Sequence, residues 1–345
     1  MECIIRQHQL PSYSSRLTER YFGGMRMGVF DIETMGLNPA SAEVILAGFL
    51  EVSGDGTAVA RQYFAENKNQ ERELLLAVQQ ELQRYDMVLT YNGKHFDLPF
   101  IEKRAGLCSV PLSAAGCYNL DLYLVLHGHS NLKSVLKNLR QKTVEDYMGL
   151  NPDRKDEISG AESIQIYESY LREPEGKKKE ALKEKVLLHN HDDLLQLYRL
   201  LPILQQADLH RAMSYLGFPV AGCFGWPQLN LSRIRIDYRG LSFQGTYGGT
   251  GFSYLSYDDG RSPFSCQFTP EGEFQFLVAT RRHKGSHYLQ LSDFFESDSV
   301  FCRYPGYENG FLILTQGNSS QHLEINMFVQ TFLQHFMETI PCPLT

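Results

Sequence analysis

Apolar residues in the first part of the chain form short runs that predict a sheet. The runs lie at 27–32, 44–52, 59–64, 87–91 and 119–122. A turn sequence, Ser-Gly-Asp-Gly, separates the second run from the third. The first three strands are therefore expected to pair as an antiparallel meander.

Between and after these runs, apolar residues recur every three or four positions, which predicts helices. The expected helices cover 70–85, 96–104, 131–139, 164–171 and 178–204. Strands that alternate with helices after an antiparallel start predict an α/β fold, in which helices pack on a mixed sheet.

The pattern changes in the last third of the chain, where Tyr, Phe, Ser and Gly become frequent. Alternating segments such as 234–238 and 274–278 are separated by turn sequences. This arrangement predicts antiparallel hairpins that form a small sheet, sandwich or barrel. A last helix is expected to follow, with Ser319 or Ser320 as its N-cap.

A chain of 345 residues is long enough for two domains, each with its own core. The change in pattern divides it into an α/β domain at 1–205, a linker at 206–228, and a smaller antiparallel β domain with a C-terminal helix at 229–345.

Composition narrows the class of protein. The net charge of −7 argues against binding nucleic acid through bulk positive charge, but it does not argue against an enzyme with clustered carboxylates. The seven cysteines are scattered, so a zinc site and disulfides are not expected and a reducing cytoplasm is favoured. The N-terminus lacks a signal-peptide pattern, and no apolar stretch is long enough to span a membrane.

Two carboxylates occupy alternate positions at the end of the first apolar run. Asp31 and Glu33 are two residues apart on a predicted strand, so both point to the same face. Two buried like charges repel each other unless a cation lies between them. Carboxylate oxygens without a nearby cysteine suit Mg²⁺ or Mn²⁺. Taken alone, the pair is equally consistent with carboxylates that bind nothing.

Further candidates lie at helix positions. Asp97 opens a predicted helix, where the helix dipole alone also favours a carboxylate. His189 and Asp193 are four residues apart and lie within an apolar stripe, so they are expected to be buried on one helix face and to need a partner. Their neighbours His191 and Asp192 fall on other faces and are expected to be solvent-exposed.

Together these residues resemble the DEDD exonuclease superfamily, the proofreading-exonuclease branch of the ribonuclease H fold. The resemblance is greatest to its YprB-like ribonuclease H-like domain group, it covers about residues 25–205, and the segment 150–170 shares it. It implies a ribonuclease H-like mixed sheet flanked by helices. The motifs are Asp31-Ile-Glu33-Thr-x-Gly36-Leu37, Asn92-Gly-Lys-x-Phe96-Asp97 and His189-Asn190-x-x-Asp193.

The resemblance also implies roles. Asp31 would bridge two divalent ions, Mg²⁺ or Mn²⁺, and Glu33 would bind one ion and hold the attacking water. Asp97 and Asp193 would complete the metal shells. His189 stands where many members carry Tyr, and would orient or deprotonate the water. A histidine titrates near neutral pH, as this role requires.

The implied activity is a metal-dependent nuclease that releases nucleotides from a 3′ end, and its partner would be DNA or RNA with a single-stranded end. Two alternatives stay open: a non-catalytic nucleic-acid-binding module and a structure-specific endonuclease. Thr34, Asn92 and Lys94 are candidate substrate contacts, although an exposed lysine near a turn more often contacts nothing. Asp121 is expected to support the site without touching the metal.

The predicted β domain resembles no family that we can name. Its arginines and aromatic residues could form a basic rim with stacking platforms for nucleic acid. Ordinary sheet alternation, with arginines outward and aromatics inward, explains them as well, and we favour it; the domain could equally serve dimerisation. The residues concerned are Arg233, Arg235, Arg239, Arg281, Arg282, Lys284, Tyr247, Phe252, Tyr254 and Tyr257.

Overall fold

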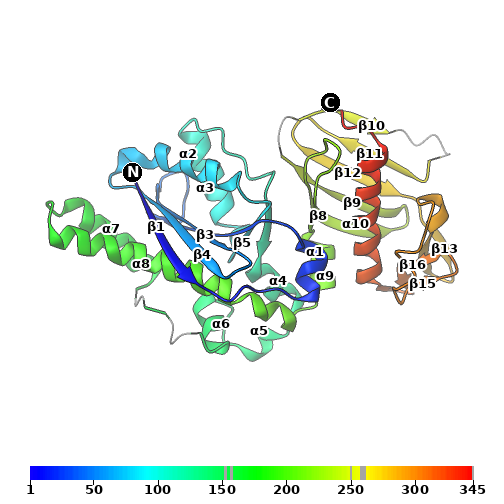
Figure 1. The fold of residues 1–345 in the computed structure, drawn as a ribbon, viewed down its shortest axis with the longest axis horizontal. Helices are drawn as coiled ribbons and strands as arrows, with labels where there is room; N and C mark the ends of the chain where they lie inside the picture. Colours follow the sequence, from blue (N-terminus) through cyan, green and yellow to red (C-terminus); the bar gives the residue numbers. More distant parts are fainter. Residues whose placement is uncertain (151–153, 156–157, 249–250, 257–261, 344–345) are drawn as a thin grey trace. The chain divides into compact units, whose positions relative to one another are not determined.

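The computed structural model describes residues 1–150, 154–155, 158–248, 251–256 and 262–343. The chain divides into two compact units, coloured along the sequence in Figure 1. The first unit comprises Met1–Glu19 and Gly23–Ala207, and the second comprises Arg20–Phe22 and Asp208–Thr345. Within the described part of the chain, no helix has the length and apolar character needed to cross a membrane.

The first unit is built on a mixed sheet of six strands in the order β1-β4-β3-β2-β5-β6. Strands β2, β3 and β4 pair antiparallel, as the meander predicts, and β5 and β6 add in parallel to β2. The edge strand β1 was not predicted, because its residues are half polar and form no apolar run. The strands are β1 Glu2–Gln9, β2 Met27–Thr34, β3 Val44–Val52, β4 Thr57–Phe64, β5 Met87–Thr90 and β6 Tyr118–Asp121.

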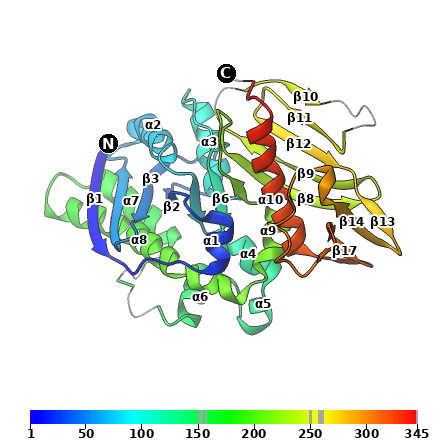
Figure 2. The same ribbon diagram turned by 45° about the vertical axis from the view of Figure 1, so that its right-hand side comes forward.

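Helices cover both faces of this sheet (Figures 1 and 2). On one face, α2 (Glu71–Leu82) and α3 (Asp97–Leu107) bury Leu75, Val78 and Ile101 in a cluster with sheet residues such as Phe30 and Phe49. The opposite face is covered by α7 (Gly160–Arg172) and α8 (Lys177–Arg199). Its core includes Leu46, Phe64, Tyr167 and Val186.

Helix α8 approaches the sheet closely where Gly48 lies in β3. A Cβ atom at Gly48 would lie 2.2 Å from Oδ1 of Asn190 and 2.7 Å from Cδ1 of Leu194, both on α8. Gly48 pairs directly with Asp31 across the β2–β3 ladder. The missing side chain therefore lets α8 reach the strand that carries Asp31.

Three helix predictions in the first unit extend past the observed helices, and the one over 70–85 ends at Leu82. The segment 131–139 contains only α5 (Leu132–Val135), because the Leu139 carbonyl accepts from the Tyr91 hydroxyl at 2.6 Å and the Asn138 side chain accepts from the Arg140 N–H at 3.0 Å. Helix α8 ends at Arg199 and is followed by a 3₁₀ helix, Leu201–Gln206. Pro202 lacks the N–H that would continue the α-helical ladder.

Three further helices complete the first unit, and a fourth begins within it. The three are α4 (Leu122–His129), α5 and α6 (Gln141–Tyr147). Helix α1 (Arg16–Phe22) contributes its last residues to the second unit. There Tyr21 is buried, with its hydroxyl 2.6 Å from Nδ1 of His210.

The second unit is an antiparallel β structure with a C-terminal helix. Its largest sheet has the order β10-β11-β12-β9-β8-β7, and smaller sheets join β13-β14-β16-β15 and β17-β18. The strands are β7 Pro219–Val220, β8 Leu229–Asp237, β9 Gly240–Tyr247, β10 Tyr254–Ser256, β11 Phe264–Phe268, β12 Glu273–Val278, β13 Arg281–His283, β14 Ser286–Gln290, β15 Tyr307–Glu308, β16 Phe311–Ile313, β17 Thr315–Gln316 and β18 Ser319–Ser320.

The stretch expected to be a linker contains α9 (Leu209–Leu216) and β7, and both belong to the second unit. The last helix, α10, runs from His322 to Thr339. The predicted serine cap is wrong, because Ser319 and Ser320 form β18 and Gln321 holds the N-cap position. Tight turns before the helix leave the serines paired with Thr315 and Gln316 instead.

Two of the candidate stacking residues of the second unit, Tyr247 and Phe252, point inward. Both are buried and contact the ring of Phe268, whereas Arg233 and Arg235 are exposed. Sheet alternation is therefore confirmed for these residues, and they are not available as stacking platforms. Tyr257 lies outside the described residues.

Candidate metal centre

Asp31 and Glu33 lie on the face of β2 that is turned toward α8. Between them, Ile32 packs into the opposite core cluster with α2 and α3. Glu33 is buried and Asp31 remains partly exposed. The β2–β3 register shifts between Glu33 and Thr34, which marks a bulge directly after the two carboxylates. The strand period therefore brings both acids to one place, as the sequence predicts.

Asp97 reaches the same strand from the first turn of α3. The side chain is buried, and its Oδ1 accepts a hydrogen bond from the backbone N–H of Ile32 at 3.2 Å. This bond ties the start of α3 to β2 between Asp31 and Glu33. The position at the helix N-terminus also favours a negative charge.

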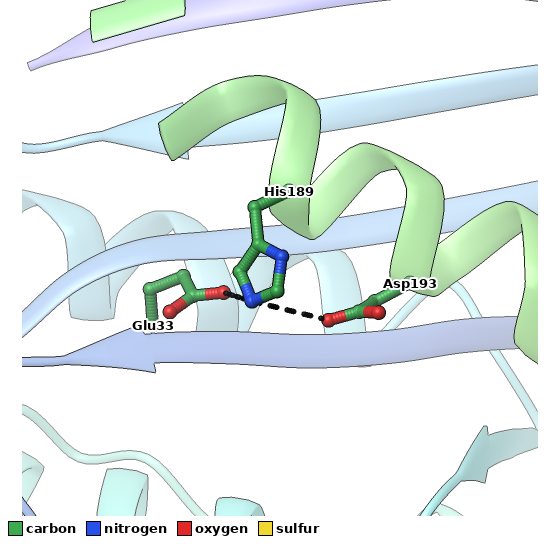
Figure 3. A group of neighbouring side chains, drawn as sticks. All are labelled: Glu33, His189 and Asp193. Carbon is green, nitrogen blue, oxygen red and sulfur yellow. Dashed lines mark ion pairs between the residues drawn. The ribbon is translucent and has the colours of Figure 1, made fainter. Parts of the chain in front are cut away.

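His189 and Asp193 enter from α8, one turn apart on the same face. Nε2 of His189 lies 3.6 Å from Oε1 of Glu33 and 3.6 Å from Oδ2 of Asp193, so the imidazole sits between the two carboxylates (Figure 3). One ligand atom from each of these three residues lies within 4.8 Å of the other two. The inward orientation expected for His189 is therefore observed.

The expectation that His191 and Asp192 are solvent-exposed is wrong, because both are buried. Nε2 of His191 lies 2.9 Å from Nε2 of His8 on the edge strand β1. Asp192 accepts a hydrogen bond from the backbone N–H of Lys155 at 2.5 Å. Strand β1 and Lys155 thus cover a helix face whose polar sequence suggests that it is exposed to solvent.

The carboxylates repel one another and resist ionisation. Burial raises the pKa of Asp31, and the charges of Asp97, Asp193 and Glu33 raise it further. Burial also raises the pKa of Glu33 to about 7, against the favourable effect of His189. The pKa of Asp97 rises to about 7, chiefly through burial. Such a cluster of hard oxygen donors, with one imidazole, fits a divalent cation that would favour the charged forms.

A chain of amides holds Asp31 in position. Nδ2 of Asn190 donates to Oδ2 of Asp31 at 2.9 Å, and Oδ1 of Asn190 accepts from Nε2 of Gln62 at 2.8 Å. Gln62 is fully buried and in turn accepts from Nη1 of Arg6 at 2.6 Å. The chain links α8, β4 and β1 behind the carboxylate cluster.

One cation lies against the cluster. The Arg154 guanidinium donates to Oδ1 of Asp193 and forms two hydrogen bonds of 2.9 Å with the Glu145 carboxylate. The arginine and glutamate side chains are buried, with exposed fractions of 7% and 0%. Sequence reasoning missed Arg154, because a lone arginine outside a periodic segment gives no signal.

The candidate substrate contacts lie in two turns. Thr34 donates its hydroxyl hydrogen to the Gly36 carbonyl at 2.8 Å, which stabilises the turn after β2. Asn92 has a left-handed backbone (φ 65°), and Lys94 is exposed. Asp121 accepts from the backbone N–H groups of Asn92 at 2.9 Å and Lys94 at 3.0 Å, so it shapes this turn.

Asn190 and Gln62 were given no role from the sequence. Asn190 lies between His189 and Asp193 in a recognised motif, and Gln62 interrupts the apolar positions of β4. A buried amide in an apolar setting needs hydrogen-bond partners, and this is the only signal that the sequence offers for either residue.

Comparison with known proteins gives one family and several more distant similarities. A family model for the RNase H superfamily matches residues 29–205. A DNA polymerase from Methanocaldococcus jannaschii is 29% identical over 80 residues, which are 22% of this chain and 5% of the polymerase. This chain therefore spans a small part of that relative's length.

Two solved structures are similar to part of this chain at low identity. The family B DNA polymerase from the hyperthermophilic archaeon Pyrobaculum calidifontis has a TM-score of 0.40 and 21% identity, covering 52% of this chain and 25% of that one. Brucella melitensis NrnC has a TM-score of 0.33 and 17% identity, covering 56% and 78%.

The family match extends from β2, which carries Asp31 and Glu33, to the end of the 3₁₀ helix after α8. It covers about half of the chain, and the observed mixed sheet with flanking helices confirms the predicted ribonuclease H-like fold. The chain belongs to the RNase H superfamily through residues 29–205.

Proposed function

We propose that this chain is a two-metal-ion nuclease that hydrolyses phosphodiester bonds and releases nucleotides from the 3′ end of a nucleic acid. The observation that carries the proposal is the convergence of four buried or partly buried carboxylates from three separate elements, two of which flank one histidine. The residues are Asp31, Glu33, Asp97, Asp193 and His189. In a protein that only binds nucleic acid, this cluster would lower the affinity, because carboxylates repel phosphate.

We assign Asp31, Glu33, Asp97 and Asp193 as the metal ligands. Two Mg²⁺ or Mn²⁺ ions bound there would supply an activated water and would stabilise the leaving 3′ oxygen. Their donors are all carboxylate oxygens, which such ions prefer. Burial raises the pKa values of Glu33 and Asp97 to about 7, so cation binding near neutral pH would favour release of protons from both groups.

We assign His189 as the residue that orients the attacking water and receives its proton. The relevant atom is Nε2, which lies 3.6 Å from a carboxylate oxygen of Glu33 and 3.6 Å from one of Asp193. Glu33 would hold the same water on its other side. The imidazole is buried, so bulk water competes little for this proton.

Nucleic acid as substrate is supported by the family and by the similarity to a protein named a DNA polymerase. Lys94 is the candidate phosphate contact because it is exposed in a turn that follows β5 directly. Asn92 and Thr34 would contribute to substrate binding by fixing the shape of the turns beside the site. The free cysteines suit a reducing compartment, and we propose the cytoplasm.

The test is incubation of the protein with end-labelled single- and double-stranded DNA and RNA, in Mg²⁺, Mn²⁺ or EDTA. We expect stepwise shortening from the 3′ end that EDTA abolishes. Products of internal cleavage would show that the protein is an endonuclease and not an exonuclease. Binding without cleavage would indicate a binding module.

The same assay tests the metal ligands through Asp31→Asn. This variant should lose cleavage by roughly a thousandfold or more while binding nucleic acid as well as the wild type, because it removes a ligand and one repulsive charge. Asp55→Asn is the control, since Asp55 is an exposed carboxylate in the turn before β4. Full activity in Asp31→Asn would refute the proposed function.

A further inference from the structure

Arg154 occupies an unusual position beside the candidate metal centre. Its Nη2 donates to Oε1 of Glu145 at 2.9 Å and also to Oδ1 of Asp193, while its Nε donates to Oε2 of Glu145 at 2.9 Å. Glu145 belongs to α6 and Asp193 to α8. One guanidinium thus joins a carboxylate of the candidate centre to a carboxylate outside it.

The two carboxylates differ in how much of their charge the arginine balances. Glu145 is fully buried and binds the planar fork of the guanidinium through both oxygens, which fixes the orientation of the arginine. Asp193 keeps 19% of its side chain exposed and accepts one hydrogen bond from the guanidinium, through Oδ1. Glu145 is therefore the anchor, and Asp193 is the partner that a competing cation can take.

A guanidinium that contacts Asp193 should lower the affinity of the same carboxylate for a divalent ion. Both are cations, both need the Asp193 oxygens, and at this depth their repulsion is weakly screened. Without any cation, however, the same guanidinium offsets the repulsion between the Asp193 carboxylate and the neighbouring carboxylates of the cluster. Its effects on the metal-free protein and on metal binding therefore have opposite signs.

We propose that Arg154 is the internal counter-ion of the candidate centre, a positioning residue that stabilises the metal-free fold and lowers the affinity for divalent ions. The proposal rests on the proposed function, because it takes Asp193 as a metal ligand. Anchored on Glu145, Arg154 allows the carboxylates to pack before a cation arrives and keeps the bound cation exchangeable.

The proposal predicts that replacing Arg154 and replacing Glu145 change the Mn²⁺ affinity in opposite directions. Arg154→Met removes the competing charge, so Mn²⁺ should bind about tenfold more tightly, while the thermal midpoint in EDTA falls. Glu145→Gln leaves the full guanidinium charge facing Asp193, so Mn²⁺ should bind several-fold more weakly. Arg154→Lys keeps the charge and should remain closer to the wild type in Mn²⁺ affinity than Arg154→Met.

The experiment is titration of the full-length chain with Mn²⁺ by calorimetry, together with thermal midpoints in EDTA and in Mn²⁺. Arg104→Met is the matched control, because Arg104 and Glu71 form another buried pair in the same unit, with exposed fractions of 12% and 6%. This control should lower the midpoint in EDTA without changing the Mn²⁺ affinity.

Each outcome decides one question. If Arg154→Met and Glu145→Gln both lower the midpoint and leave Mn²⁺ affinity unchanged, Arg154 only anchors the chain around it and the proposal is overturned. If Arg154→Met does not fold, the expected weakening in Glu145→Gln still tests the sign. If the wild type binds no Mn²⁺, the proposed metal centre itself fails, which is a different result from equal binding by all variants.

Discussion

The side-chain amide of Asn190 donates a hydrogen bond of 2.9 Å to the carboxylate of Asp31. Gln62 holds the other end of this amide, and Gly48 leaves the space in which it lies. The charges of three other carboxylates repel the charge of Asp31. Asn190 therefore fixes the orientation of the Asp31 carboxylate, and its hydrogen bond favours the charged form.

Replacement of Asn190 tests this relationship. Asn190→Leu should lower the single-turnover cleavage rate by roughly tenfold or more and weaken Mn²⁺ binding, because Asp31 loses its only side-chain donor among the described residues. Gln196→Leu is the control on the same helix. It is equally buried, and its Oε1 has no hydrogen-bond partner in the described part of the chain, so its rate should stay near the wild type.

Replacement of His189 separates a catalytic from a structural role. His189→Ala should lower the single-turnover rate by roughly a hundredfold or more with little change in substrate binding, and His189→Tyr should restore part of the rate. The physical reason is the position of Nε2 between Glu33 and Asp193. A folded His189→Ala protein with the wild-type rate and a lowered thermal midpoint would show that the imidazole has only a structural role in the core.

The stability of the metal-free protein should depend on pH. In the folded state the pKa values of Glu33 and Asp97 are about 7, above their ordinary values of 4.5 and 3.8. The folded protein therefore holds protons that the unfolded chain releases. The stability that these groups contribute is complete below about pH 4 and is lost as the pH rises through about 7.

Thermal midpoints measured in EDTA between about pH 4 and 8 should accordingly fall with rising pH. Saturating Mn²⁺ should remove most of this fall, because the cation binds the deprotonated carboxylates and so lowers their pKa in the folded state. Glu33→Gln should reduce the slope in EDTA. An identical slope in this variant would show that the dependence arises elsewhere in the chain.

The first unit is expected to fold and act without the second. A truncated protein ending at residue 207 keeps the sheet and the helices on both faces. It should carry Tyr21→Ser, because Tyr21 is buried in the second unit, where its hydroxyl accepts from Asn326 at 3.0 Å.

Removal of the second unit should change the affinity or range of substrates more than the rate of the chemical step. The measurement is single-turnover cleavage at saturating substrate, beside the full-length chain. A folded truncated protein that cleaves no substrate of the full-length chain would show that the second unit is part of the catalytic unit.

The sequence by itself determined which residues share a face. A strand period of two puts Asp31 and Glu33 together, and a helix period near four puts His189 and Asp193 together. The order of apolar runs also predicted the meander, the mixed sheet and the antiparallel β structure. Each of these features follows from the spacing of residues within a single segment, and this spacing can be read from the sequence.

Only the tertiary structure decided which faces meet. The approach of α8 to β2 depends on Gly48, and the burial of His191 depends on His8 in an edge strand whose polar residues hide it from sequence analysis. The ion pair between Arg154 and Asp193 joins a residue outside any periodic segment to one that is 39 positions away. Periodicity describes one element at a time, whereas a buried charge is balanced by whichever partner packing brings within reach.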